Sequence, residues 1–451
     1  MPIRIGQYVN LTNLKLGTSQ INKVCIGSVS VWEFDSPFYV QDASGSQNTL
    51  RITQSTASAP SVTVYKSTDN NNWETLGTPD TSGVTATVPA NGRLYLRAAA
   101  NAWATGDTDY ISITMDGDYT VGGNIDSLIR GASYNRYSTN FPSSSTTNNL
   151  NSLFLGSTTL TDANDLYLPY TNLLAKSYRA MFKGCTSLAR IPQMDRVANL
   201  ADYCFQSMFE GCSSLTNIPT LSYASVPSYA YNAMFKGCTS ITAAPDLPAT
   251  TLGNYCYNEM FSGCTSLATA PATLPATSVP NLGYVSMFEG CSALVTAPSL
   301  AMTSMGNNAC SRMFMNCTSL VTPPPILRPT TLVASCYVQM FAGCSSLASA
   351  PQLSAAYMQS ACYSNMFKDC TSLTTAPDLY IAQLATNCFK SMFQGCSSLN
   401  SIKYDGTSWS TTMAADWVDG VAAAGTFYKR SSASIATGTS GIPSGWTVVD
   451  L

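Results

Sequence analysis

Cysteine is the residue type in this chain with the most chemistry to offer, since thiolates bind metals, form disulfides and act as nucleophiles. The 451 residues include 16 cysteines and no histidine. Nine cysteines recur at steps of 26 or 27 residues; they are Cys185, Cys212, Cys238, Cys264, Cys291, Cys317, Cys344, Cys370 and Cys396. Six more lie three or four residues before a recurring Met; they are Cys204, Cys256, Cys310, Cys336, Cys362 and Cys388. Cys25 alone falls outside this pattern.

The spacing of these cysteines argues against a metal site. Zinc and iron–sulfur sites use closely spaced Cys pairs or Cys with His, and the sequence has neither a C-x-x-C pair nor any His. Thiols at the same position of consecutive repeats point the same way, which is the wrong relative geometry for a disulfide. We therefore expect free thiols that pack as small apolar groups, with no metal and no cofactor.

Catalysis is equally unsupported by the residue types present. Without His, a Ser or Cys nucleophile would need another base, and no pair of acidic residues recurs. The carboxylates in the repeats occupy positions whose residue type changes from copy to copy; they are Glu210, Asp246, Glu259, Glu289 and Asp378. The sequence therefore predicts a protein that is not an enzyme and has no catalytic residues.

An eight-residue motif that contains the nine recurring cysteines occurs nine times, from MFKGCTSL at residues 181–188 to MFQGCSSL at residues 392–399. Units of this size cannot bury their own apolar face and must stack, so the repeat predicts a solenoid. Helix-capping residue types six positions before most of the Met residues, and Gly, Asn316 or Asp369 three positions after it, predict a helix of about two turns ending in a left-handed residue. A recurring Leu or Ile then leads into a short extended segment, which recurring prolines keep short and which stacks as a parallel ladder.

The predicted fold class is thus an α/β solenoid of leucine-rich repeats of about 26 residues, preceded by an all-β sandwich-like domain. We expect a β-hairpin attachment module at 1–36, a β-sandwich at 37–118, a linker or amino-terminal cap at 119–150, the solenoid at 151–402 and a carboxy-terminal cap at 403–451.

Both ends of the predicted solenoid carry recognisable variants. Leu153–Leu160 reads as a degenerate first unit in which Ser157 replaces Cys, a change that suits a terminal face open to water. At the other end, one helical face is expected to close the stack, with Trp446 as a plug. Its residues are Met413, Trp417, Val418 and Val421.

Charge and hydropathy restrict the partners. The net charge is −3, only 10% of residues are charged, and no Lys/Arg run is present, so nucleic acid and anionic lipid are excluded as expected partners. The sequence contains no apolar window of roughly 20 residues and no export signal at its start, so we expect no membrane insertion and synthesis in the cytoplasm.

A candidate ligand-binding row follows the recurring proline by one or two residues. Its members are Gln193, Thr220, Asp246, Thr273, Ser299, Gln352 and Asp378. Stacked on consecutive units, they would form a polar stripe on the strand side. An ordinary hydrated surface is the alternative interpretation of the same residues.

The unit YCYNEMFSGCTSLATAPATLPAT at 255–277 closely resembles the BspA-like leucine-rich repeats of Bacteroidales surface proteins and of phages that infect those bacteria. The resemblance covers about residues 153–402. The flanks GNIDSLIRG and GTFYKR…GIPSGWTVVD also resemble segments that accompany such repeats, and LGTSQINKVCIGSVSVW resembles the amino-terminal segments of phage virion proteins. The resemblance to BspA-like repeats implies a right-handed leucine-rich solenoid used for adhesion or protein binding, and it carries over no catalytic residue.

These observations lead us to expect a non-enzymatic phage virion appendage, such as a tail or head fibre, located on the virion. Its amino-terminal region would contact other virion proteins, and its solenoid would bind a glycan or protein on the surface of a Bacteroides-type host. The absent export signal favours this reading over a bacterial cell-surface adhesin. A structural decoration protein without a ligand remains a further alternative, and a homo-oligomer stays open.

Overall fold

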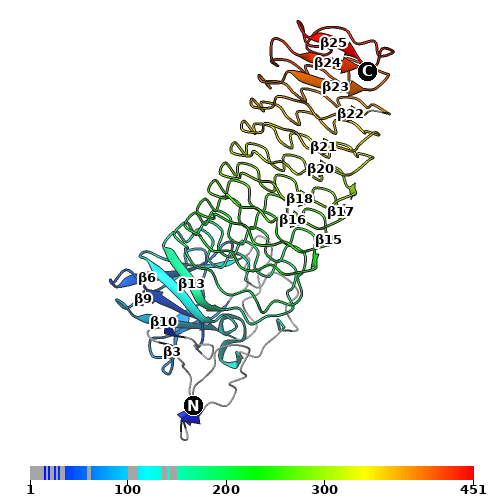
Figure 1. Ribbon diagram of the computed structural model, residues 1–451. Helices are drawn as coiled ribbons and strands as arrows, with labels where there is room; N and C mark the ends of the chain where they lie inside the picture. Colours follow the sequence, from blue (N-terminus) through cyan, green and yellow to red (C-terminus); the bar gives the residue numbers. More distant parts are fainter. Residues whose placement is uncertain are drawn as a thin grey trace.

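The computed structural model describes residues 36–57, 62–99, 110–134, 140–142, 150–380 and 382–451, and the backbone of four residue pairs between 15 and 30. A β domain lies at one end of the molecule, and the repeats extend from it as a column of stacked coils that ends at the carboxy terminus (Figure 1). We call one repeat a coil. Of the predicted attachment module at 1–36, most lies outside the described residues.

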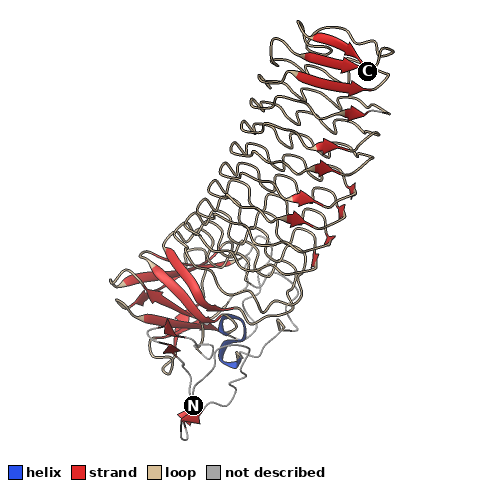
Figure 2. Ribbon diagram, viewed as in Figure 1, coloured by secondary structure: helices blue, strands red, loops and turns tan. Residues whose placement is uncertain are grey.

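Each coil has a turn side and a strand side. The turn side runs from about six residues before the recurring Met to the following Cys, for example residues 254–264. The strand side follows from the recurring Leu, for example residues 267–280. Along the described coils the strand side does not form one continuous sheet, and Figure 2 shows short arrows separated by long stretches of loop.

The helix predicted on the turn side is wrong. Among the described residues the helices are α1 (Ser127–Arg130) and the 3-10 helix η1 (Gly131–Ser133), both before the repeats (Figure 2). The turn side consists of successive tight turns, and positive φ angles recur at every fourth residue. In one coil these are Tyr203, Ser207 and Gly211, with φ of 60°, 54° and 77°. An α-helix cannot contain such residues, because the left-handed conformation interrupts its hydrogen-bond pattern.

Hydrogen bonds along the stack explain why turns replace the helix. The amides of residues 203, 205, 207, 209 and 211 donate to carbonyls of the following coil, as from Phe209 to Met234 at 2.9 Å. The intervening amides close turns within their own coil, as from Met208 to Phe205 at 3.1 Å. Both sets of groups are therefore satisfied without any bond to the fourth preceding carbonyl. The predicted left-handed positions are confirmed, including Asn316 at 61° and Asp369 at 60°.

Two of the residues predicted as helix caps have a different role. The Asp202 carboxylate accepts from the amide of Ser228 at 3.0 Å, and the Asn281 side chain accepts from the amide of Asn307 at 2.8 Å. Each acceptor serves the next coil rather than a helix that it begins.

A column of ten phenylalanine rings forms the centre of the stack. Neighbouring rings are stacked with centroids 5.2–5.7 Å apart; the residues are Phe154, Phe182, Phe209, Phe235, Phe261, Phe288, Phe314, Phe341, Phe367 and Phe393. The recurring Met, Cys and Leu side chains are fully buried around this column. The core is therefore one continuous apolar cluster rather than a set of separate ones.

The nine recurring thiols do more than fill space. Each donates to the carbonyl of a Phe in the preceding coil at 2.9–3.1 Å, as from Cys212 to Phe182 at 3.1 Å. The Phe182 carbonyl also accepts from the amide of Cys185, so both of its lone pairs are used. The fifteen described cysteines are free and buried, and burial raises the pKa of thiols such as Cys264 to about 12.

The strand side pairs in parallel, as predicted, but through very short elements. The two-residue strands are β14 (Ser225–Val226), β15 (Thr251–Leu252), β16 (Thr273–Leu274), β17 (Ser278–Val279), β18 (Ser299–Leu300), β19 (Ser304–Met305), β20 (Ile326–Leu327), β21 (Gln352–Leu353) and β22 (Leu379–Tyr380). The pairs are β14–β15, β16–β18, β17–β19 and β20–β21, all in parallel. The recurring prolines lack the amide that a longer ladder would require.

The β domain contains a six-stranded and a three-stranded sheet. The larger has the order β13-β12-β5-β10-β7-β8 and the smaller β11-β6-β9. Their bounds are β5 (Tyr39–Asp42), β6 (Asn48–Gln54), β7 (Val64–Ser67), β8 (Glu74–Gly77), β9 (Val84–Val88), β10 (Arg93–Ala98), β11 (Ile111–Met115), β12 (Tyr119–Asn124) and β13 (Leu160–Tyr167). Before this domain, β1 (Lys15–Leu16) pairs with β2 (Ser19–Gln20), and β3 (Cys25–Ile26) with β4 (Val29–Ser30), both antiparallel.

The larger sheet continues directly into the repeats. Strand β12 lies in the segment predicted as linker or cap and pairs in parallel with β13, which belongs to the first coil. In turn, Asp162 of β13 forms a parallel bridge to Arg190 of the next coil. The β domain thus supplies the surface on which the first coil stacks.

Ser157 in this first coil is not open to water, contrary to the prediction. Its hydroxyl lies 2.7 Å from that of Tyr119 in β12, and it is only 2% exposed. The β domain covers the coil, so the polar replacement is matched by a polar partner. Stacking of Phe154 on Phe182 confirms that Leu153–Leu160 is a degenerate first unit.

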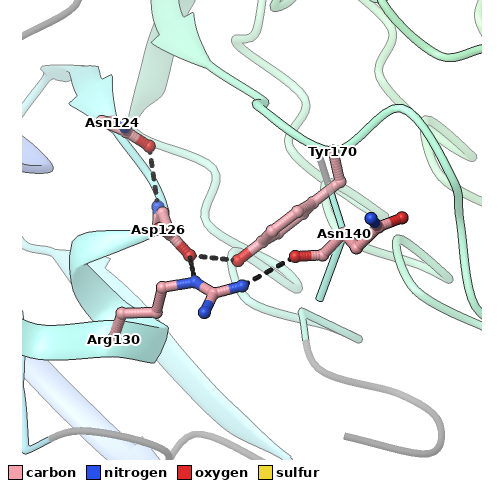
Figure 3. Close-up of polar contacts among 5 residues, drawn as sticks. All are labelled: Asn124, Asp126, Arg130, Asn140 and Tyr170. Atoms are coloured by element: carbon pink, nitrogen blue, oxygen red, sulfur yellow. Dashed lines mark hydrogen bonds and ion pairs between the residues drawn. The ribbon is translucent and has the colours of Figure 1, made fainter. Parts of the chain in front are cut away.

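A buried polar cluster fixes the junction between the β domain and the repeats (Figure 3). The fully buried Asp126 accepts from Arg130 at 3.1 Å and from the hydroxyl of Tyr170. Arg130 also donates to the carbonyl of Asn140 at 2.7 Å. Burial and the neighbouring Asp126 carboxylate raise the pKa of Tyr170 above its ordinary value. Asp126 and Arg130 come from the β domain and Tyr170 from the repeats, so the cluster joins the two parts.

The far end of the stack is closed by side chains that the sequence identified, on turns rather than a helix. Met413, Trp417 and Val418 are buried and Val421 is partly buried. Strands β22, β23 (Ser401–Asp405), β24 (Thr426–Lys429) and β25 (Thr447–Asp450) form a parallel sheet. Trp446 is 7% exposed and donates to the Ala422 carbonyl at 2.8 Å.

The hydrogen bonds of the recurring thiols predict that two buried cysteines contribute unequally to the free energy of unfolding. Cys264→Ala removes a thiol that donates to Phe235 at 3.1 Å, whereas the Cys256 sulfur lies 3.9 Å from its acceptor. Both are fully buried, so Cys256→Ala is the matched control. We expect Cys264→Ala to lower the free energy of unfolding by about 0.5–1.5 kcal/mol more than the control, as measured by urea denaturation. Equal losses would show that the thiols act by volume alone.

The junction cluster predicts that the Tyr170 hydroxyl stabilises the folded protein. Tyr170→Phe removes a donor to a buried carboxylate and should lower the free energy of unfolding by about 1–3 kcal/mol. Tyr231→Phe is the control, since its buried hydroxyl has no hydrogen-bond partner among the described residues. The free energy of unfolding of Tyr231→Phe should be unchanged or slightly higher in the same thermal or urea unfolding experiment. A neutral Tyr170→Phe would contradict the proposed role of the cluster.

Candidate functional site

The structure places the predicted row on the outside of the strand side. Its members are exposed except for the half-buried Ser299; they are Gln193, Thr220, Asp246, Thr273, Ser299, Gln352 and Asp378. Thr273, Ser299 and Gln352 open the strands β16, β18 and β21, and each is followed by a buried Leu. The alternation of exposed and buried residues is what a strand with one buried face requires.

The row is not continuous. Thr273 and Ser299 are direct partners in the β16–β18 pair, but Gln352 lies opposite Ile326. Ile326 therefore interrupts the polar stripe between Ser299 and Gln352. Asp378 is engaged by its own neighbours, because its carboxylate accepts from Lys403 at 3.2 Å and from the Tyr380 hydroxyl at 3.0 Å.

A second row, which the sequence reasoning missed, runs beside the first. Parallel bridges join Thr269 to Thr296 and Thr296 to Thr322, and another joins Ser349 to Thr375. These side chains are exposed, and they lie two residues after the recurring Leu. The recurrence of Thr or Ser at that position was the available signal. This second row carries one hydroxyl in each of five consecutive coils.

Between the two rows lies a shallow depression of about 450 Å³. Its polar lining comes from Thr296, Thr322, Ser349 and Ser299, and its apolar lining from residues 323–325 and from Pro351. Residues 323–325 are three consecutive prolines, which fix the backbone and leave no amide to donate. The depression therefore offers hydroxyl groups and rigid apolar rings side by side. Of the predicted row, Ser299 takes part in it.

Two exposed tyrosines lie on the coils at this end of the depression: Tyr357 on the coil that contributes Ser349 and Pro351, and Tyr380 on the coil after it. Tyr357 is 52% exposed and Tyr380 is 47% exposed. The Lys403 ammonium lies 5.4 Å from the centre of the Tyr380 ring and 3.3 Å from its hydroxyl. Lys403 and Asp378 thus hold Tyr380 in one orientation. The contact raises the pKa of Lys403, because its hydrogen bonds to Tyr380 and Asp378 favour the charged form.

A different tyrosine ladder lies on the turn side. Tyr203, Tyr229 and Tyr255 stack with centroids 4.4 Å apart, each at positive φ. Lys176 covers the free face of Tyr203 at 5.5 Å. Because their ring faces cover one another, these side chains offer little surface for stacking on a ligand. We interpret the ladder as a stabilising feature of the coils.

Within the described ranges, no group of three or more His, Cys, Asp and Glu side chains is arranged to hold a metal ion. Burial raises the pKa of the thiols of Cys264, Cys344 and Cys396 to about 12, which keeps them protonated at neutral pH. The described part of the molecule contains no helix long and apolar enough to cross a lipid bilayer.

Comparison with known proteins defines the class as a leucine-rich repeat protein. A model of the BspA type leucine-rich repeat region matches six copies, over residues 170–295, 206–321 and 309–413, and these matches together cover more than half of the chain. The chain therefore belongs to the BspA-type leucine-rich repeat proteins. Repeats of this type indicate a surface or adhesion-type protein, and leucine-rich repeat proteins are typically non-enzymatic.

Among solved structures, a leucine-rich repeat protein from Bacteroides ovatus is similar at 17% identity over 56% of this chain and 81% of that chain, with a TM-score of 0.21. No curated protein matches the chain.

Strand β21 predicts a sharp contrast between neighbouring residues. Leu353 is 7% exposed and fills the core, so Leu353→Ala should lower the free energy of unfolding by about 2–5 kcal/mol. Gln352 is exposed, and Gln352→Ala should change it by less than about 0.5 kcal/mol. Urea denaturation of both variants measures the difference. Similar losses would contradict the assignment of the row to the outer surface.

Proposed function

We propose that this protein is a non-enzymatic binding protein that attaches to a host cell surface through the strand side of a leucine-rich solenoid. The depression of about 450 Å³ carries the proposal, since it combines hydroxyl groups with rigid apolar rings on an exposed face. The backbone of that face is already paired between coils, so the exposed side chains are free to differ and to recognise a ligand.

The place of action that we propose is a phage particle. The amino-terminal region would attach the chain to other virion proteins as part of a tail or head fibre, and the repeats would project toward the host. The buried Asp126–Arg130–Tyr170 cluster supports this division of roles, because it joins the β domain firmly to the first coils. The ligand would be a glycan or a protein of a Bacteroides-type host envelope.

Two other proposals use the same fold. In one, the chain is a BspA-like adhesin on a bacterial cell surface. In the other, it is a decoration protein of the virion that has no ligand. Fractionation separates them: an appendage co-purifies with phage particles, whereas an adhesin is found on intact uninfected cells.

Binding to host envelopes tests the proposed function. The labelled full-length chain is titrated onto envelopes of a panel of Bacteroidales strains, and saturable binding is expected for at least one. Thr322→Arg places a bulky charge in the depression and should weaken that binding at least about tenfold, because it blocks contact with the hydroxyl rows. Thr386→Arg, at an exposed position on the turn side, is the matched control and should bind like the unmodified chain.

Circular dichroism and urea denaturation of the two Arg variants verify that both remain folded. No saturable binding to any envelope, with particle association intact, would favour the decoration role. Equal binding by Thr322→Arg and Thr386→Arg would place the contact elsewhere on the chain.

A further inference from the structure

We infer that the ligand of the strand side is an uncharged polysaccharide, and that Tyr357 and Tyr380 are its stacking residues. This inference rests on the proposed function and specifies its ligand. The observations that carry it are the charge distribution of the face, the chemistry of the depression and the exposure of the two tyrosines.

The strand side around the depression carries a single charged side chain, the exposed Arg328 that directly follows β20. Residues 265–280, 292–306, 318–327 and 345–360 contain no Asp, Glu, Lys or Arg. The Lys236–Glu259 ion pair at 2.6 Å lies on the turn side instead. A polyanion such as a phosphorylated or uronic-acid polymer needs several cationic partners, and beside those ranges this face offers Arg328 alone. An uncharged polymer has no such requirement.

The depression supplies the two kinds of contact that a sugar ring offers. Hydroxyls of Thr296, Thr322 and Ser349 can both donate and accept hydrogen bonds, as the hydroxyls of a sugar do. The proline rings beside them can cover the apolar faces of the sugar. Because the coils repeat in the direction of the stack, this chemistry recurs along a line, which suits a polymer better than a single small molecule.

Two exposed tyrosines lie on different ladders of the strand side. Tyr380 is in β22, two residues after Asp378 of the predicted row, whereas Tyr357 bridges Thr331 and Gln383 in a separate ladder. Tyr357 belongs to the coil that contributes Ser349 and Pro351, and Tyr380 to the coil after it. A large aromatic side chain that stays about half exposed is available to pack on a ligand. Lys403 and Asp378 restrain Tyr380, so less conformational entropy is lost when it does so.

An extended peptide is disfavoured as the occupant. A peptide that binds a sheet by strand addition needs an unpaired edge, but here the backbone pairs with coils on both sides, as at Thr296 with Thr269 and Thr322. Recognition on this face therefore depends on side chains, and these are short hydroxyl, alanine and proline side chains. They match the hydroxyls and ring faces of a neutral sugar polymer.

The experiment uses the full-length chain and the envelope that binds it best. Polysaccharide extracted from that envelope is separated by anion exchange into neutral and anionic fractions, and each is titrated calorimetrically. The neutral fraction should bind, and its affinity should change less than about twofold between 50 and 500 mM NaCl, because no ion pair is screened. Periodate treatment of the envelope, which cleaves sugar diols, should abolish binding, whereas protease treatment should not.

Variants then test the stacking residues. Tyr380→Ala and Tyr357→Ala should each weaken binding of the neutral fraction about tenfold, as expected for a tyrosine at an interface. Tyr380→Phe should retain most of the affinity, since it keeps the ring. Val448→Ala, at another exposed apolar residue near the end of the stack, is the control and should bind normally.

The possible failures point to different conclusions. Binding that resists periodate but is lost after protease treatment would overturn the polysaccharide inference and leave the proposed function intact, with a protein receptor. Binding restricted to the anionic fraction, or strongly weakened by salt, would also overturn it. Unchanged affinity of both Ala variants would remove the tyrosines from the site. Failure of every envelope to bind would instead contradict the proposed function itself.

Discussion

The backbone hydrogen bonds between coils are the constraint on which the rest of this structure depends. On the turn side, every second amide donates to a carbonyl of the next coil, while the amides between them close local turns. On the strand side, parallel bridges and two-residue strands continue the same pairing. An unpaired buried amide or carbonyl is costly, so a coil is stable only against a neighbour.

This constraint determines which side chains can occupy the interior. The pairing holds successive coils at a constant separation, and side chains at the same position then form columns, as the ten Phe rings do. Carbonyls that face the core need a second donor small enough to fit beside the rings. The recurring Cys meets that need, because its thiol reaches the Phe carbonyl of the preceding coil at about 3.0 Å. Where the neighbour is the β domain, Ser157 pairs with Tyr119 instead.

The same pairing leaves the outer surface free to carry function. Because the backbone is satisfied along the stack, exposed residues can change without loss of the fold. That freedom allows hydroxyl and proline residues to gather around the depression on the strand side, while the Lys183–Glu210 and Lys236–Glu259 ion pairs lie on the turn side. The cluster of Asp126, Arg130 and Tyr170 joins the first coils to the β domain.

The sequence by itself determined the repeat length, the buried and exposed positions, the left-handed residues at Gly, Asn316 and Asp369, and the two terminal units. These follow from local spacing and from residue types with strong conformational preferences. It could not determine that the turn side avoids a helix, because the competing acceptors lie about 26 residues away in the next coil, and local capping signals do not reveal them. The partner of Ser157, the interruption of the polar row at Ile326 and the depression beside Ser299 were likewise decided by tertiary structure. Each arises from residues far apart in the chain, brought together only when the coils stack.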